Sequence, residues 1–139
     1  MVRNTPSYQS KKMLLRNLNE AALAGANTAL GLMKRRVFNQ GRSVNGNIGR
    51  YRSRSYRKKR QEAGRQVARK DLEFDGDLRR AIVAGKRRDG AVIGFNSERL
   101  AKISIYQEEQ TGEQIFRLTR REIDAARNAF VKHYRRRAR

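Results

Sequence analysis

Residues 81–95 read AIVAGKRRDGAVIGF and are central to the fold expected for this chain. Two runs of small and β-branched residues flank Arg88-Asp89-Gly90, and Asp-Gly between such runs is a strong signal for a tight β-hairpin. The sequence therefore predicts two antiparallel strands joined at this turn. Asn96-Ser97-Glu98 then provides a helix N-cap, so a short helix is expected as far as about Gly112. Residues 115–118 are expected to add a further short strand.

A capping box marks the start of the last helix. Thr119 and Glu122 stand three residues apart, so each side chain can bond the backbone N–H of the other residue. Leu118 and Ile123 occupy the apolar positions that flank such a cap. A C-terminal helix is therefore predicted, and its apolar stripe consists of Ile123, Ala126, Phe130 and Tyr134.

One long helix is predicted at the N-terminal end, over residues 5–38. Thr5-Pro6 is typical of a helix start, and Asn39-Gln40-Gly41 is typical of a helix end. Small and apolar residues recur between them in steps of three and four, which places them on one face. Since Ala and Gly let another backbone approach closely, we expect a tight contact with a helix or a sheet. The face comprises Leu14, Leu18, Ala22, Gly25, Ala29, Leu32 and Met33.

Positive charge is concentrated in the first half of the chain. The 139 residues include 34 Lys and Arg against 13 Asp and Glu, a formal net charge of +21, and only two of the acidic residues precede residue 71. Residues 41–70 add Gly, Ser and Asn to this charge and show no apolar period, so an extended arm or long loop ordered by a partner is expected. The chain is thus predicted to be a single α+β domain, residues 1–139. Its parts are the helix 5–38, the basic arm 41–70, an α+β core 71–134 and a basic tail 135–139.

The sequence lacks the patterns that enzymes and metal proteins need. With no Cys and a single His, His133, thiolate sites, histidine metal sites and catalytic triads are not expected. Acidic residues alternate at Asp71, Glu73, Asp75 and Asp77, which favours one solvent face salt-bridged to arginines. A calcium loop is not expected, because it needs further oxygen ligands. We therefore predict no catalytic residue, no cofactor and no metal. No apolar run is long enough to span a bilayer, so no membrane partner is expected either.

The stretch RYRSRSYRKKR, residues 50–60, interleaves arginines with serines and two tyrosines. Guanidinium groups bind phosphate in a bidentate manner and tyrosine stacks on bases, so nucleic acid is a reasonable partner. Acidic surfaces of neighbouring subunits fit equally well. Since helix-turn-helix, zinc-finger and RNA-recognition signatures are missing, contact with DNA is expected to be independent of its sequence. The candidate partner- or DNA-binding residues are Arg50, Arg52, Arg54, Arg57, Lys58, Lys59 and Arg60.

Several short motifs follow one another in the second half. They are DLEFDGDLRRAI (71–82), VIGF (92–95), LAKI (100–103) with YQ (106–107) and TG (111–112), and FRLTRREI (116–123). Their order resembles the tail completion and virion morphogenesis proteins of tailed bacteriophages, a family of head–tail connector, neck and tail terminator components. The long first helix and the basic stretch before the Gly-Asp-Leu element are similar to that family as well.

The resemblance implies a viral structural protein of the virion, not an enzyme, that forms a homo-oligomeric ring of six- or twelve-fold symmetry at the head–tail junction. Its implied partners are portal or adaptor proteins and tail proteins, with non-specific contact to genomic DNA, after virion assembly in the host cytoplasm. The alternative is a stand-alone basic nucleic-acid-binding module without sequence-specific readout. We expect cyclic assembly through the hairpin and the small-residue helix face. The expected interface residues are Leu18, Ala22, Gly25, Ala29, Val92 and Phe95.

Overall fold

The computed structural model describes residues 8–73 and 76–137 of the chain. The layout is α+β, as the sequence predicts. The predicted helix start at Thr5-Pro6 lies outside the described residues. The elements follow one another as α1 (Tyr8–Lys34), the π-helical turn η1 (Arg35–Asn39), α2 (Arg54–Glu62), α3 (Asp77–Ala81), β1 (Ile82–Arg87), β2 (Gly90–Phe95), α4 (Glu98–Thr111) and α5 (Arg120–Arg137).

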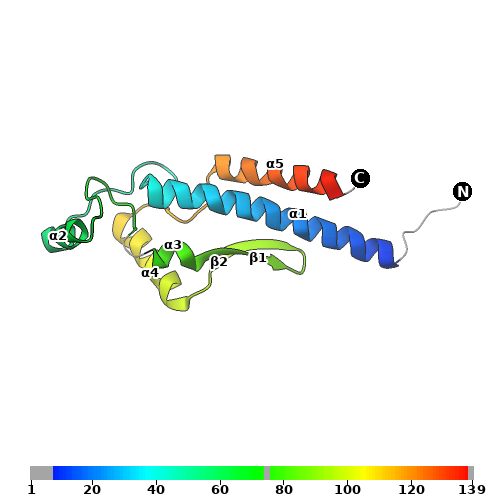
Figure 1. Ribbon diagram of the computed structural model, residues 1–139, viewed down its shortest axis with the longest axis horizontal. Coiled ribbons are helices and arrows are strands. Elements are labelled where there is room, and N and C mark those ends of the chain that lie inside the picture. The colour runs from blue at the N-terminus through cyan, green and yellow to red at the C-terminus, as the bar shows by residue number, and fades with distance from the viewer. Residues whose placement is uncertain (1–7, 74–75, 138–139) are drawn as a thin grey trace, which may run out of the picture.

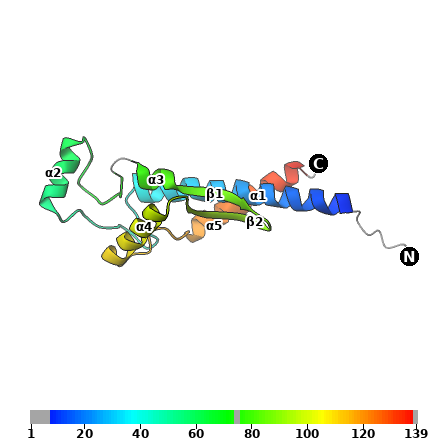
Figure 2. The same cartoon turned by 90° about the horizontal axis from the view of Figure 1, so that it is seen from below.

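Helix α1 is the long axis of the molecule. Figures 1 and 2 show α5 along one side of α1, the β1–β2 hairpin along another side, and α2 set apart beyond one end. The contact between α1 and α5 is closest at Gly25, where an added Cβ would lie 2.7 Å from the carbonyl oxygen of Ala126. The predicted close approach of another backbone is therefore confirmed, and it occurs within this chain.

The hydrophobic core lies where the end of α1 meets the hairpin. Strands β1 and β2 pair antiparallel, with Ile82 opposite Phe95 and Gly85 opposite Val92, so the predicted hairpin is confirmed. Alternation along the strands turns Ala84 and Ile93 toward the core and leaves Val83 and Val92 on the outer face. The buried apolar cluster consists of Leu30, Met33, Val37, Phe38, Ile48, Ile82 and Ile115.

The further strand predicted over residues 115–118 is wrong. Within the described part of the chain the sheet has two strands, and residues 115–118 are irregular. The side chain of Glu108 accepts from the backbone N–H groups of Ile115 and Phe116, at 3.2 and 2.9 Å. Their backbone donors are thus satisfied without a strand ladder, while the Ile115 side chain is fully buried in the core.

The predicted helix boundaries of the second half are confirmed by their caps. The Ser97 hydroxyl accepts from the Leu100 N–H at the start of α4, and Gly112 adopts the left-handed conformation after its end. At the start of α5, the Glu122 N–H donates to the Thr119 hydroxyl at 3.2 Å, and the Thr119 N–H donates to the Glu122 carboxylate at 3.1 Å. This reciprocal pair is the capping box that the sequence predicts.

A buried ion pair joins the end of the first helical segment to the start of the last one. Arg36 of η1 donates to both carboxylate oxygens of Glu122, at 2.7 and 3.2 Å. The same guanidinium donates to the carbonyl oxygens of Arg42, Ile115 and Arg117, at 3.0, 3.0 and 2.9 Å. All five N–H groups of Arg36 are engaged, which is what a buried arginine needs to offset its lost hydration.

Candidate partner-binding site

The basic segment contains a helix, so the expectation of an extended arm is wrong for residues 54–62, whereas the residues on either side of them form loops. Residues 54–62 form α2, whose N-cap Ser53 accepts from the Tyr56 N–H at 3.2 Å. The chain then turns back, and the Lys70 N–H donates to the Gly49 carbonyl oxygen at 2.7 Å. The two ends of the segment are therefore joined, and α2 projects beyond the end of α1 (Figure 1). We call residues 48–73 the basic end.

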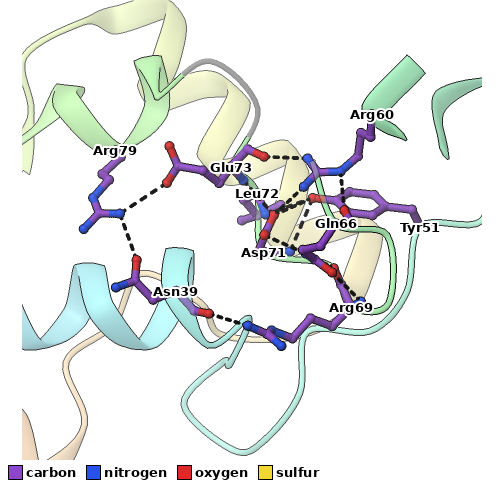
Figure 3. A network of polar contacts seen from close by, with 9 residues as sticks. All are labelled: Asn39, Tyr51, Arg60, Gln66, Arg69, Asp71, Leu72, Glu73 and Arg79. Carbon is purple, nitrogen blue, oxygen red and sulfur yellow. Dashed lines mark hydrogen bonds and ion pairs between the residues drawn. The ribbon is translucent and has the colours of Figure 1, made fainter. Parts of the chain in front are cut away.

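Arg60 is the centre of the polar network that holds the basic end together (Figure 3). Its side chain is fully buried and lies 4.3 Å from the centre of the Tyr51 ring. It donates to the Asp71 carboxylate at 3.0 Å, to the Glu73 carbonyl oxygen at 2.5 Å and to the Gln66 carbonyl oxygen at 3.1 Å. The prediction that Arg60 contacts a partner is therefore wrong, because the chain itself encloses and pairs this cation.

Asp71 is the acceptor that matches Arg60. Its carboxylate also accepts from the Tyr51 hydroxyl at 3.1 Å, from the Gln66 side-chain amide at 2.6 Å and from the Glu73 N–H at 3.0 Å. Burial, together with the neighbouring Asp71 carboxylate, raises the pKa of Tyr51 well above its usual value. The predicted solvent face of alternating acids is thus wrong for Asp71, which is buried.

The other alternating acids stay near arginines, as the sequence predicts. Glu73 pairs with Arg79 at 3.5 Å and Asp77 pairs with Arg80, whereas Asp75 lies outside the described residues. Figure 3 shows how Arg79 continues to the Asn39 side chain at the end of η1. The network therefore connects the basic end to the body of the molecule.

Leu72 adopts an unusual backbone conformation inside this network. Its φ is 57°, the one positive φ among the non-glycine residues that the structure describes. Its N–H donates to the Tyr51 hydroxyl at 3.1 Å, and the Asp71 N–H donates to the same oxygen at 3.3 Å. The tyrosine therefore holds a strained turn that a sequence pattern does not reveal.

Most of the predicted partner-binding cations remain on the surface. They lie on α2 and on the loop before it, and the buried network leaves their side chains facing outward. The exposed predicted residues are Arg50, Arg52, Arg54, Arg57, Lys58 and Lys59.

A cleft of about 640 Å³ separates the loop before α2 from α4. Arg50, Arg52 and Lys70 reach it from the basic end, and Arg99 reaches it from α4. Sequence reasoning missed Lys70 and Arg99 as candidate site residues, because the cleft joins segments that are distant in the sequence. Arg99 follows a helix cap and carries no signal of its own.

Part of the predicted subunit interface is buried by contacts within the chain. Gly25 is buried under Ala126 of α5, and Ala29 is 1% exposed, so both are wrong as contacts for another subunit. Phe95 is half-buried and packs edge-on against Phe116, with ring centres 5.5 Å apart. Leu18 and Ala22 are half-buried, and Val92 is exposed.

The outer face of the hairpin is apolar and thinly covered. Val83 and Val92 are 38% and 36% exposed, and Gly85 and Gly94 lie on the same face. Neither glycine has a positive φ, and an added Cβ on either would meet no described atom within 4 Å. The fold of the single chain therefore does not require glycine at these two positions.

The described residues contain no group of three or more His, Asp and Glu side chains that could hold a metal ion. His133 is half-buried in α5. Among the described helices, none combines the length and apolar character needed to cross a membrane. Comparisons with protein families, curated proteins and solved structures found no significant match to this chain.

Proposed function

We propose that this protein is a structural subunit of the head–tail junction of a tailed bacteriophage. In this role it assembles into a six- or twelve-fold ring at the neck, and joins portal or adaptor proteins to the tail without catalysing a reaction. The motif resemblance supports this choice of assembly. The observation that carries self-assembly is the apolar outer face of the β1–β2 hairpin.

An exposed apolar face of this kind adds little to the stability of a single folded chain. The outer side of a two-stranded antiparallel sheet ordinarily carries polar residues, whereas this one presents Val83 and Val92 to solvent. Glycines within strands weaken them, and they often mark places where another backbone comes close. Gly85 and Gly94 satisfy no need of the chain itself, so a second copy packed here accounts for both glycines and both valines.

Assembly of the full-length chain at low salt tests this proposal. Sedimentation velocity and native mass spectrometry should find a closed ring for the wild type and smaller species for Val92→Glu. Ile105→Glu is the matched control, because Ile105 is 58% exposed on α4 and receives the same charge away from the hairpin. A wild type that stays monomeric in the presence of virion partners, or equal effects of both variants, contradicts the proposal.

A stand-alone nucleic-acid-binding module is the second candidate, and the exposed cations of α2 favour it. The two candidates differ in where the protein is found. A fixed copy number in purified virions, with density at the neck, supports the structural subunit. Absence from virions together with steeply salt-dependent binding to free DNA supports the module.

A further inference from the structure

The cleft between the basic end and α4 gathers positive charge from two sides. Arg50 and Arg52 line it from the loop before α2, Lys70 from the loop after α2, and Arg99 from α4. Asp77 is the single carboxylate among the described lining residues, and it is engaged by Arg80. The cleft therefore carries an excess of cations that its own wall does not neutralise.

These cations also lack side-chain partners within the part of the chain that the structure describes. Among the described residues, no side-chain hydrogen bond or ion pair involves Arg50, Arg52, Lys70 or Arg99. Lys70 is half-buried, and burial together with the neighbouring Arg52 lowers its pKa. Two like charges held together at a partly buried site are unfavourable, so a bound anion would stabilise them. Arg36 and Arg60, by contrast, each donate to a carboxylate and to carbonyl oxygens within the chain.

The remaining wall of the cleft suits a flat ring. Tyr51 and Tyr56 line it as a tilted pair, with ring centres 5.3 Å apart, and Tyr56 is 37% exposed. Leu72, Leu100 and Ile103 add apolar surface. A nucleotide combines a phosphate anion with a planar base, whereas the side chain of an acidic residue offers the charge alone. The volume of about 640 Å³ is in the range of small-molecule sites and admits a nucleotide, not the width of a duplex.

We propose that this cleft binds a single strand of nucleic acid. Arg52, Lys70 and Arg99 contact its phosphate groups from both walls, and Tyr56 offers its ring to a base. The inference does not depend on the proposed place in a virion, because it concerns binding by the chain in solution.

Fluorescence anisotropy with a labelled oligothymidylate of 12 nucleotides tests the cleft. The cleft variant is Arg52→Gln/Lys70→Gln/Arg99→Gln. The control variant is Lys86→Gln/Arg87→Gln/Arg88→Gln, which removes the same three charges from exposed positions around the hairpin turn. We expect roughly a tenfold or greater loss of affinity for the cleft variant, a much smaller loss for the control, and a salt slope lowered by about 2 in the cleft variant.

Two further arms separate the alternatives. Arg54→Gln/Arg57→Gln/Lys58→Gln removes three exposed cations of α2, and the single variant Arg99→Gln changes an exposed residue of α4 that the fold does not need. Arg99→Gln should weaken binding by itself, and circular dichroism should report an intact fold. Equal losses in the cleft and control variants overturn the proposal, and so does a larger loss in the α2 variant. Equally strong competition by duplex DNA of the same strand length, or by an oligoglutamate peptide of equal charge, also overturns it.

The ring assay and this binding assay fail separately. A cleft variant that forms rings but does not bind oligothymidylate leaves the assembly proposal intact. A Val92→Glu variant that binds oligothymidylate as a monomer leaves the cleft proposal intact.

Discussion

The body around α1 and the basic end around α2 are stabilised in different ways. In the body, α1 packs against α5 and the hairpin, and a cluster of leucine, isoleucine, valine, methionine and phenylalanine side chains is buried between them. In the basic end, Ile48 joins that cluster, the other buried groups are Tyr51, Arg60 and Asp71, and hydrogen bonds replace most of the apolar contacts. A segment poor in apolar residues can therefore fold around one buried cation that donates to several acceptors.

The two regions share one device. Each has a buried arginine paired with a buried carboxylate, Arg36 with Glu122 in the body and Arg60 with Asp71 in the basic end. Removal of one partner should therefore unfold the whole molecule in the first case and only the basic end in the second.

Glu122→Gln is expected to have the largest effect. It leaves Arg36 buried without its counter-ion and weakens the capping box of α5, so stability should fall by about 3–5 kcal/mol. Urea unfolding followed by circular dichroism measures the loss. Glu109→Gln, at an exposed position of α4, is the control and should change stability by less than about 0.5 kcal/mol. Similar midpoints for the two variants would show that the pair does not hold the body together.

Asp71→Asn should open the basic end and spare the body. Arg60 then loses its ionic partner, and the local free energy of opening should fall by about 2–3 kcal/mol. Limited proteolysis should cut residues 50–70 of the variant rapidly, while the thermal unfolding of the body changes little. Glu62→Gln, an exposed position of α2 itself, should leave the cleavage rate near that of the wild type. Unfolding of the whole chain by Asp71→Asn contradicts the separation of the two regions.

Two glycines of α1 should respond in opposite directions to the same substitution. Gly25→Ala places a Cβ 2.7 Å from the Ala126 carbonyl oxygen, so stability should fall by about 1–3 kcal/mol as α5 is displaced. An added Cβ at the exposed Gly31 meets no described atom within 4 Å, so Gly31→Ala should stabilise the helix by about 0.5–1 kcal/mol. Measured by calorimetry, the unfolding temperature should fall for Gly25→Ala and rise for Gly31→Ala. A rise in both variants would mean that α1 and α5 do not pack closely.

Lys70→Gln is expected to have the smallest effect. Burial and Arg52 lower the pKa of Lys70, so its charged form is disfavoured in the folded chain relative to the unfolded one. Stability from this group therefore rises with pH, from the lowered pKa up to the usual value of 10.5. At pH 7 the variant should be more stable by about 0.5 kcal/mol or less, since the site is partly exposed.

The same substitution should weaken oligothymidylate binding. Lys70 would then lower the stability of the folded chain while it strengthens binding. The advantage of Lys70→Gln over the wild type should disappear as the pH approaches 10.5. Local stability measured by proteolysis across this pH range checks the trend. An advantage that does not change with pH would mean that charge at Lys70 is not its cause.

The body could be predicted from the sequence, whereas the basic end could not. Asp89-Gly90, Ser97 and the Thr119–Glu122 box are local signals, and the structure places the hairpin and the helix starts where they indicate. The Ala and Gly face of α1 correctly predicts a close contact, but not that α5 of the same chain supplies it. Periodicity states which face is covered and does not identify the covering element.

The basic end has no such signal. Arg60 is one of seven cations within residues 50–60, and nothing in its neighbours marks it as the buried one. Its burial depends on Asp71, on Tyr51 and on the turn at Leu72, which the folded chain alone brings together. The irregular residues 115–118 escaped prediction for a related reason, because Glu108 and Arg36 satisfy backbone groups that a strand would otherwise pair.

Hydrogen exchange of the full-length chain, without any partner, reports whether the basic end is folded on its own. Residues 48–73 are expected to be folded by their own polar network. If so, the amides of Arg57 in α2, of Ala63 at its C-cap, and of Lys70 and Leu72, which all donate within the basic end, should exchange much more slowly than those of an unstructured chain. Exchange at the unstructured rate throughout this segment, with α1 and α5 still protected, would contradict the account.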